Sequence, residues 1–140
     1  MAAVSQVDSR WAKWIGIPFK DRGRSKDGVD CFGLVWLALF EEFGLRVPSY
    51  AEEYADAYDR VEVAGLIAGE VVSRWRPIAA GEEQPGDVLV FRMLWRPSHV
   101  GLIIAHSLFI HCREGVNSCL EHYDAPSWRH RIEGIYRYAG

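Results

Sequence analysis

The chain has 140 residues, which suits one compact domain, and we expect a single domain over residues 1–140. Apolar residues make up 49% and charged residues 25%, as in ordinary globular proteins. The net charge of −3 gives no support to nucleic-acid binding, and no apolar run is long enough to cross a membrane. The first residues lack the basic and apolar regions of a signal peptide, so we expect synthesis in the cytoplasm without one.

The first half of the chain is predicted to be mainly helical, because its apolar residues recur at helical spacing. Asp30 is suited to cap a helix that is apolar on almost every side and therefore buried, and Gly44 is placed to end it. The expected helices cover residues 5–15, 31–43 and 51–75, with a polar loop over residues 16–29 and a linker from Pro77 to Gly86.

The second half changes to the short apolar runs and alternation of β-strands. The expected strands cover residues 88–91, 99–104, 107–112, 117–121 and 132–138. Helices followed by strands that pair as an antiparallel meander indicate an α+β fold. N-terminal helices should then pack on a C-terminal sheet of about five strands.

Cys31 is the first candidate for chemistry, because it stands at the start of the buried helix. A helix N-terminus and a nearby imidazole both stabilise a thiolate, which is the nucleophilic form of cysteine. The backbone N–H of Cys31 belongs to the first helical turn, where it has no intrahelical acceptor and suits an oxyanion.

His99 and His111 are expected on neighbouring strands. A short odd-membered loop centred on Ala105 pairs the two positions, which places the imidazoles on one face, about 5 Å apart at Cβ. A one-residue slip would separate them onto opposite faces. If the buried helix packs on that face, Cys31 meets His99. Cys31 is then the nucleophile, His99 the base and later the acid, and His111 the group that fixes the tautomer of His99.

Each of these residues also has a structural interpretation, as a small buried hydrophobe or a hydrogen-bonded core histidine. The order of helix-start cysteine, histidine and histidine favours a catalytic site over that interpretation. A zinc site formed by Cys31, His99, His111 and Cys112 is disfavoured, because the adjacent residues His111 and Cys112 point to opposite sides of a strand. We expect no metal and no cofactor.

Cys112 and Cys119 flank a predicted hairpin turn that begins at Gly115. A type II′ turn there places the two cysteines opposite each other, about 5.5 Å apart at Cα, where a disulfide is geometrically conceivable. Reduced thiols are the more usual state in the cytoplasm.

Four motifs in this order resemble those of the NlpC-type cysteine peptidases: residues 30–35 (DCFGLV), 85–91 (PGDVLVF), 99–101 (HVG) and 109–111 (FIH). These proteins are papain-like, circularly permuted enzymes of bacterial cell-wall turnover. The resemblance covers about residues 19–120. It implies a Cys31, His99 and His111 site and cleavage of a peptidoglycan stem peptide, typically between D-glutamate and diaminopimelate or lysine.

The chain looks most like the stand-alone version of these peptidases, which is encoded in phage and gene-transfer-agent tail clusters. The resemblance therefore implies tail-tip or baseplate partners, incorporation in a phage-like tail particle, and action in the periplasm or cell wall during DNA delivery. The net charge and the lack of a long apolar run lead us to expect neither nucleic-acid binding nor membrane insertion.

Two positions depart from the family pattern. Phe32 follows the nucleophile where the family usually has serine, and Phe19 occupies the position of a tyrosine but has no hydroxyl. Arg22 and Arg24 are candidates to replace that hydroxyl by binding a stem-peptide carboxylate, or they are solvated loop charges. We include Asp30 among the candidate substrate contacts.

Two other functions compete with the peptidase. A tail-tip or assembly component that keeps the fold with little activity fits the loss of the hydroxyl at Phe19 and the six tryptophans, which suit partner binding. A different thiol acyl transfer, such as acyl exchange on a lipid, is compatible with the same scaffold.

Overall fold

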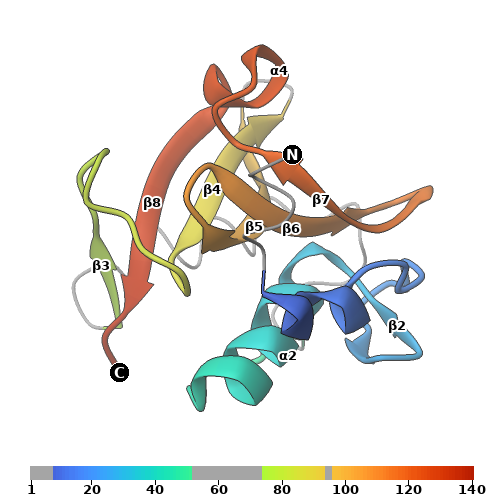
Figure 1. Ribbon diagram of the computed structural model, residues 1–140. Helices are drawn as coiled ribbons and strands as arrows, with labels where there is room; N and C mark the ends of the chain where they lie inside the picture. The colour runs from blue at the N-terminus through green and yellow to red at the C-terminus, as the bar shows by residue number, and fades with distance from the viewer. Residues whose placement is uncertain (1–7, 52–73, 94–95) are drawn as a thin grey trace.

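The computed structural model describes residues 8–51, 74–93 and 96–140 (Figure 1). The predicted helix over residues 51–75, with its acidic first half, lies almost entirely outside these ranges. At its end the prediction is wrong, because Trp75 begins the short strand β3 (Trp75–Pro77). Within the described residues, no helix combines the length and the apolar character that a membrane span requires.

The first described element is a 3₁₀ helix, η1 (Ser9–Trp14), inside the predicted helix over residues 5–15. The Asp8 side chain accepts a hydrogen bond from the backbone N–H of Arg10 and so caps it, and the backbone becomes extended at Ile15. The loop that follows contains a small hairpin of β1 (Arg24–Ser25) and β2 (Gly28–Val29).

Helix α2 (Cys31–Phe43) confirms the predicted bounds and both caps. The Asp30 carboxylate accepts a hydrogen bond of 2.7 Å from the backbone N–H of Gly33. At the other end, Gly44 takes the left-handed conformation with φ +67°, and its N–H donates to the carbonyl oxygen of Phe40. Local capping chemistry is therefore sufficient to define the helix that presents Cys31.

Six of the described strands form one antiparallel sheet in the order β3-β8-β4-β5-β6-β7. Its remaining strands are β4 (Val88–Met93), β5 (Arg96–Ala105), β6 (Leu108–Arg113), β7 (Val116–His122) and β8 (Ile132–Tyr138). Strands β4 to β7 form the predicted meander, but β8 pairs with β4 instead of β7, which corrects that prediction. The short helix α4 (Pro126–Arg129), which was not predicted, lies on the path from β7 to β8 (Figure 1).

The return of β8 to β4 is fixed by an ion pair. Arg137 on β8 donates two hydrogen bonds, of 2.7 and 2.9 Å, to the carboxylate of Asp87, the residue just before β4. Asp87 is buried, so this bidentate pair is stronger than an exposed one.

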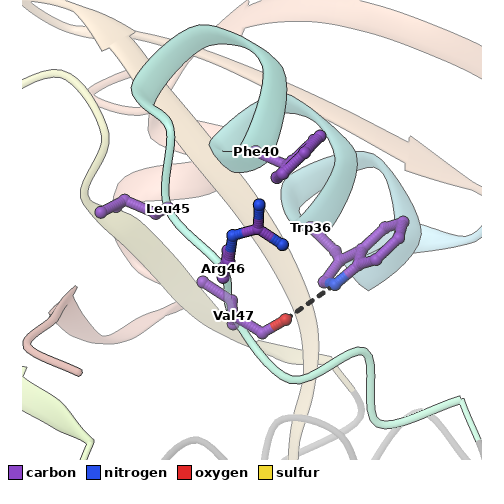
Figure 2. Close-up of a pocket in the computed structure, with 5 residues that line it drawn as sticks. All are labelled: Trp36, Phe40, Leu45, Arg46 and Val47. Carbon is purple, nitrogen blue, oxygen red and sulfur yellow. Dashed lines mark hydrogen bonds between the residues drawn. The ribbon is translucent and has the colours of Figure 1, made fainter.

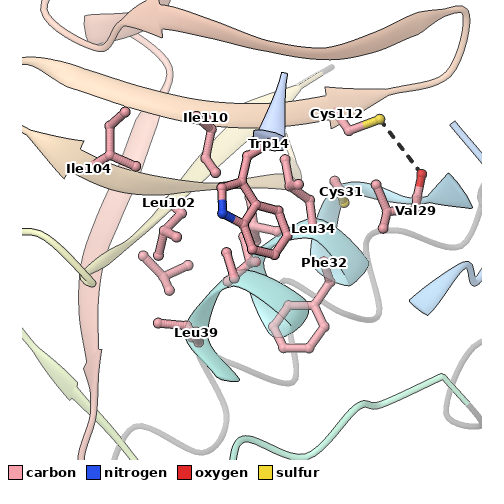
Figure 3. Close-up of a cluster of buried hydrophobic side chains, with 14 of the residues drawn as sticks. Trp14, Val29, Cys31, Phe32, Leu34, Leu39, Leu102, Ile104, Ile110 and Cys112 are labelled. Carbon is pink, nitrogen blue, oxygen red and sulfur yellow. Dashed lines mark hydrogen bonds between the residues drawn. The ribbon is translucent and has the colours of Figure 1, made fainter. Parts of the chain in front are cut away.

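Helix α2 packs on one face of the sheet, which we call the helix face. Buried side chains of α2 form one cluster with Val88, Val100, Leu102, Ile110 and Cys112 from the strands (Figure 3). The other face, which we call the far face, carries a second cluster: Leu89, Phe91, Ile103, Phe109, Tyr123, Trp128 and Ile135. Because strand residues alternate, His99 and His111 belong to the far face, and the body of α2 does not pack on it as the sequence analysis supposed.

The turn between β5 and β6 differs from the predicted odd-membered loop. Ala105 pairs with Leu108 across two turn residues, and Ser107 in that turn has φ +62°. Such a turn alone would place His99 and His111 on opposite faces, but a bulge between Ile103 and Ala105 shifts the register so that Ile103 pairs with Phe109. The bulge therefore returns the two histidines to one face. The shared face was predicted, but from an odd-membered loop and not from a bulge.

The hairpin of β6 and β7 also has a different register from the one expected. Arg113 pairs with Val116, and His111, instead of Cys112, pairs with Cys119. Gly115 is the second of the two turn residues, with φ +82°, and not the first. Cys112 therefore lies on the helix face and Cys119 on the far face, so they do not oppose each other, and all three cysteines are free thiols.

Candidate active site

A pair of buried histidines forms the centre of the candidate site. Nε2 of His99 on β5 lies 2.8 Å from Nδ1 of His111 on β6. The side chains are 2% and 0% exposed. The ring of Trp128 from α4 stacks at 6.0 Å from that of His99 and meets that of His111 edge-on at 4.9 Å. Aromatic rings thus exclude water from the contact between the two imidazoles.

Glu121 on β7 extends this pair to a third group. One carboxylate oxygen accepts a hydrogen bond from Nε2 of His111 at 2.7 Å, and the other accepts one from the indole N–H of Trp128 at 2.9 Å. Burial acts to raise the pKa of Glu121, but the hydrogen bonds from Trp128 and His111 outweigh it and lower the pKa. Burial lowers the pKa of His111 against the opposing effect of Glu121.

Cys31 occupies the first position of α2 and is 2% exposed (Figure 3). The buried carboxylate of Asp30 precedes it, and the Arg24 guanidinium pairs with that carboxylate at 2.9 Å. A bare carboxylate beside the thiol would disfavour the thiolate, so Arg24 removes an obstacle to its formation. Arg24 also donates to the carbonyl oxygen of Ser49 at 2.7 Å.

Cys112 ties β6 to the segment that leads into α2. Its thiol donates to the carbonyl oxygen of Val29 at 3.6 Å. Val29 is two residues before Cys31, and Cys112 itself directly follows His111 on β6. Burial, followed by the charges of Cys119 and Asp30, raises the pKa of Cys112 to about 12. Cys112 therefore acts as a buried hydrogen-bond donor and not as a nucleophile.

The other predicted contact residues lie in the loop before α2. Phe19 is half-buried, forms an isolated bridge with Val29 and packs against the core of the helix face. Arg22 is exposed and has φ +55°, and its backbone N–H donates to Asp30 at 3.2 Å. The structure thus gives Arg24 and Asp30 structural contacts and presents the Arg22 side chain to solvent.

One group of described residues has the ligand types of a metal site: His111, Cys119 and Glu121, whose ligand atoms lie within 4.8 Å of one another. The Sγ of Cys119 is 3.6 Å from Nε2 of His111. Two observations disfavour a cation there: the carboxylate already accepts two N–H donors, and the positive charge of Arg113 acts on all three groups. Cys112, a member of the zinc set considered above, lies on the opposite face from His111.

A separate apolar hollow of about 270 Å³ lies beside the exposed side of α2 (Figure 2). It is lined by Trp36, Phe40, Leu45, Arg46 and Val47, and the indole of Trp36 donates to the carbonyl oxygen of Val47 at 2.8 Å. None of the site residues predicted from the sequence lines it.

Sequence reasoning missed Glu121 and Trp128. The predicted pairing of Cys112 with Cys119 hid Glu121, because it places that residue on the face opposite His111, whereas the observed pairing of His111 with Cys119 brings it to the same face. No signal existed for Trp128, since α4 was not predicted and its contact with the histidines joins distant parts of the chain.

The described residues form an α+β domain in which a cysteine begins a buried helix and a buried imidazole pair lies on the sheet. The model of the NlpC/P60 family matches residues 16–137, and the chain belongs to this family.

Curated relatives are named as peptidases or hydrolases. The chain is 28% identical over 133 residues to the murein DD-endopeptidase MepS/murein LD-carboxypeptidase of Escherichia coli, covering 95% of the chain and 62% of that protein's length. It is 25% identical to a probable endopeptidase of Haemophilus influenzae, over 90% of the chain and 69% of that protein. It is 23% identical to the gamma-DL-glutamyl hydrolase of Bacillus subtilis, over 90% of the chain and 27% of that protein.

Solved structures show the same fold. An NlpC/P60 family protein from Bacillus cereus has a TM-score of 0.64 at 19% identity, covering 90% of this chain and 37% of the other. The NlpC/p60 domain of the peptidoglycan hydrolase SagA has a TM-score of 0.59 at 16% identity, covering 89% of both chains. These likenesses confirm the predicted α+β fold.

Proposed function

We propose that this chain is a cysteine endopeptidase that hydrolyses peptidoglycan stem peptides. The observation that carries the proposal is the buried imidazole pair, with Nε2 of His99 at 2.8 Å from Nδ1 of His111, in a family fold whose helix α2 begins at a cysteine. Curated relatives named for murein cleavage support the substrate class.

The reaction assigned to these residues has two halves. His99 takes the thiol proton of Cys31, and the thiolate sulfur attacks the carbonyl carbon of the scissile amide to form a tetrahedral oxyanion. His99 returns the proton to the leaving amine as the C–N bond breaks, which leaves a thioester on Cys31. Water then attacks the thioester, His99 accepts its proton, and the acid product and the thiol are released.

The electrostatic surroundings of Cys31 suit this chemistry. The N-terminus of α2 presents first-turn N–H groups and the positive end of the helix dipole to a developing oxyanion. The Arg24 guanidinium, paired with Asp30, offsets part of the charge with which the cap carboxylate opposes the thiolate.

We propose that the scissile bond is of the D-glutamyl–diaminopimelate type. The name of the Bacillus subtilis relative supports a γ-glutamyl bond. The name of the Escherichia coli relative points instead to a DD bond between stem peptides. These alternatives give products of different mass.

The test is digestion of purified peptidoglycan fragments, read by mass spectrometry, with the wild type beside Cys31→Ala and His99→Ala. We expect the wild type to release the D-glutamyl product, Cys31→Ala to release none, and His99→Ala to lose at least about 100-fold in rate. His106→Ala, at an exposed histidine in the β5–β6 turn, is the matched control and should keep its rate. No cleavage by folded wild type would contradict the proposal and favour a structural or assembly component with the same fold.

We further propose that the chain is a component of a phage-like or gene-transfer-agent tail particle that opens the cell wall for DNA delivery, acting in the periplasm or cell wall with tail-tip or baseplate partners. The resemblance of residues 74–78 (RWRPI) to the linker of the stand-alone tail peptidases supports this role. Mass spectrometry of purified tail particles should detect the chain, and particles without it would contradict the role.

A further inference from the structure

Glu121 faces two hydrogen-bond donors at once. The distances from its two oxygens to Nε2 of His111 and to the indole nitrogen of Trp128 are 2.7 and 2.9 Å. An ionised carboxylate has only acceptor atoms, and an indole nitrogen can only donate. The hydrogen bond between Trp128 and the carboxylate therefore has only one possible direction. Of the three groups, only His111 can change its role, by changing tautomer.

The direction of the hydrogen bond from His111 to Glu121 also determines the direction of the bond between the two imidazoles. Because Glu121 accepts, Nε2 of His111 carries the proton, and in neutral His111 the lone pair is then on Nδ1. Since Nδ1 of His111 lies 2.8 Å from Nε2 of His99, the latter nitrogen donates. The remaining nitrogen of neutral His99, Nδ1, then carries the lone pair.

We propose that Glu121 is a positioning residue of this site, whose carboxylate holds both histidines in the Nε2–H tautomer so that Nδ1 of His99 is the atom that accepts the Cys31 proton. The catalytic part of this inference rests on the proposed function, whereas the tautomer assignment does not. It makes strand β7 part of the site, beyond the cysteine and two histidines that the sequence motifs indicate.

The other groups around His111 do not provide a substitute for Glu121. His99 faces it from β5, Arg113 is a cation on its own strand, and Trp128 is a donor from α4. Cys119 on β7 is 3.6 Å away, and burial raises the pKa of its thiol, so it does not supply an anion near neutral pH. The carboxylate is the one acceptor with full negative charge among these described neighbours.

The variant Glu121→Gln tests the direction of these hydrogen bonds with almost no change in side-chain shape. Its amide offers one acceptor oxygen and one donor group to two donors, so one contact must reverse. Trp128 cannot reverse, but His111 can, by moving its proton to Nδ1. His99 must then accept at Nε2 and carry its proton on Nδ1, so that Nδ1 can no longer accept a proton.

The second variant, Trp128→Phe, removes the competing donor and keeps an aromatic ring. In the double variant Glu121→Gln/Trp128→Phe, the amide oxygen is again available to His111, and the original tautomers should return. A merely structural role for Glu121 predicts no such recovery, since Trp128→Phe removes part of a buried ring and the indole hydrogen bond.

The experiment measures histidine tautomers directly by ¹⁵N NMR of the imidazole rings in the intact chain, without substrate. We expect Nε2–H for both histidines in the wild type, Nδ1–H in Glu121→Gln, and Nε2–H again in the double variant. Unchanged spectra in Glu121→Gln, or a wild-type His111 with its proton on Nδ1, would overturn the inference.

Rates of stem-peptide cleavage give the second readout. Glu121→Gln should lose about 100-fold in kcat, and the double variant should regain about tenfold or more. Glu133→Gln is the matched control on β8, where the carboxylate accepts a hydrogen bond from Tyr136 at 3.3 Å, and it should keep the wild-type rate. If the tautomers follow the expected pattern but neither the wild type nor any variant cleaves stem peptides, the positioning by Glu121 stands and the proposed function fails. A double variant slower than Glu121→Gln would overturn the positioning role.

Discussion

Phe32 follows the candidate nucleophile and has a packing role. Its side chain is fully buried, its ring lies 5.3 Å from that of Tyr50, and the Arg24 guanidinium carbon lies 5.7 Å over it. Gly33, next along the motif, leaves space for the loop, because a Cβ there would overlap the carbonyl oxygen of Gly23. These two residues thus hold the loop that carries Arg24 against the start of α2.

Arg22 and Arg24 allow a matched test of two roles for a positive charge in one loop. Arg24→Ala leaves the Asp30 carboxylate buried, at 1% exposure, without the ion pair at 2.9 Å. We expect it to reduce the free energy of unfolding by about 3 kcal/mol, as is typical when one partner of a buried pair is removed. Urea denaturation at neutral pH measures this loss.

Arg22→Ala keeps the backbone N–H that donates to Asp30 and removes only an exposed side chain. We expect the free energy of unfolding to change by less than about 0.5 kcal/mol. A rise in KM for stem peptides in this variant would support the predicted carboxylate contact, and an unchanged KM would rule it out for Arg22. Equal destabilisation by the two substitutions would contradict the division of roles.

At the scale of single elements, the N-terminus of α2 should distinguish Cys31 from the other two thiols. A helix start and an imidazole base lower a thiol pKa, whereas burial raises the pKa of Cys112 to about 12 and raises that of Cys119. We expect iodoacetamide at about pH 7 to modify Cys31 first, with the site located by peptide mapping. Cys31→Ser should lose this fast phase, and faster labelling of Cys119 in the wild type would contradict the activation of Cys31.

The hairpins show how far local sequence determines the site. Helix α2 follows from its caps, so the placement of Cys31 was predictable from Asp30 and Gly44. The bulge near Ala105 was not predictable, because nothing in the sequence of an apolar strand indicates which residue is left unpaired. The sequence therefore predicted the shared face of His99 and His111 but not their register, and the same error in the next hairpin hid the pairing of His111 with Cys119.

At the scale of the whole molecule, the features that sequence reasoning missed are contacts between distant segments. The ion pair of Asp87 with Arg137 brings β8 to β4, and β8 follows α4, which carries Trp128 over the histidines. Periodicity identifies such strands but not their partners, which depend on pairing across the domain. The far face of the sheet, with Glu121 and Trp128, thus emerges only when all strands are placed.

The burial of this hydrogen-bonded group should make the folded protein sensitive to acid. The pKa of His111 is lowered from its ordinary 6.5 by burial, so below pH 6.5 the unfolded chain binds a proton that the folded chain resists. Burial acts to raise the pKa of Glu121, but the hydrogen bonds from Trp128 and His111 prevail and lower it from 4.5. Stability is therefore lost a second time below pH 4.5. Both contributions are present at higher pH and decrease on acidification.

We therefore expect the urea midpoint of the wild type to fall as the pH decreases through 6.5 and again below 4.5. His111→Asn removes the first titrating group and should flatten the upper part of this dependence. Parallel pH curves for the wild type and His111→Asn would contradict the lowered pKa of this buried imidazole.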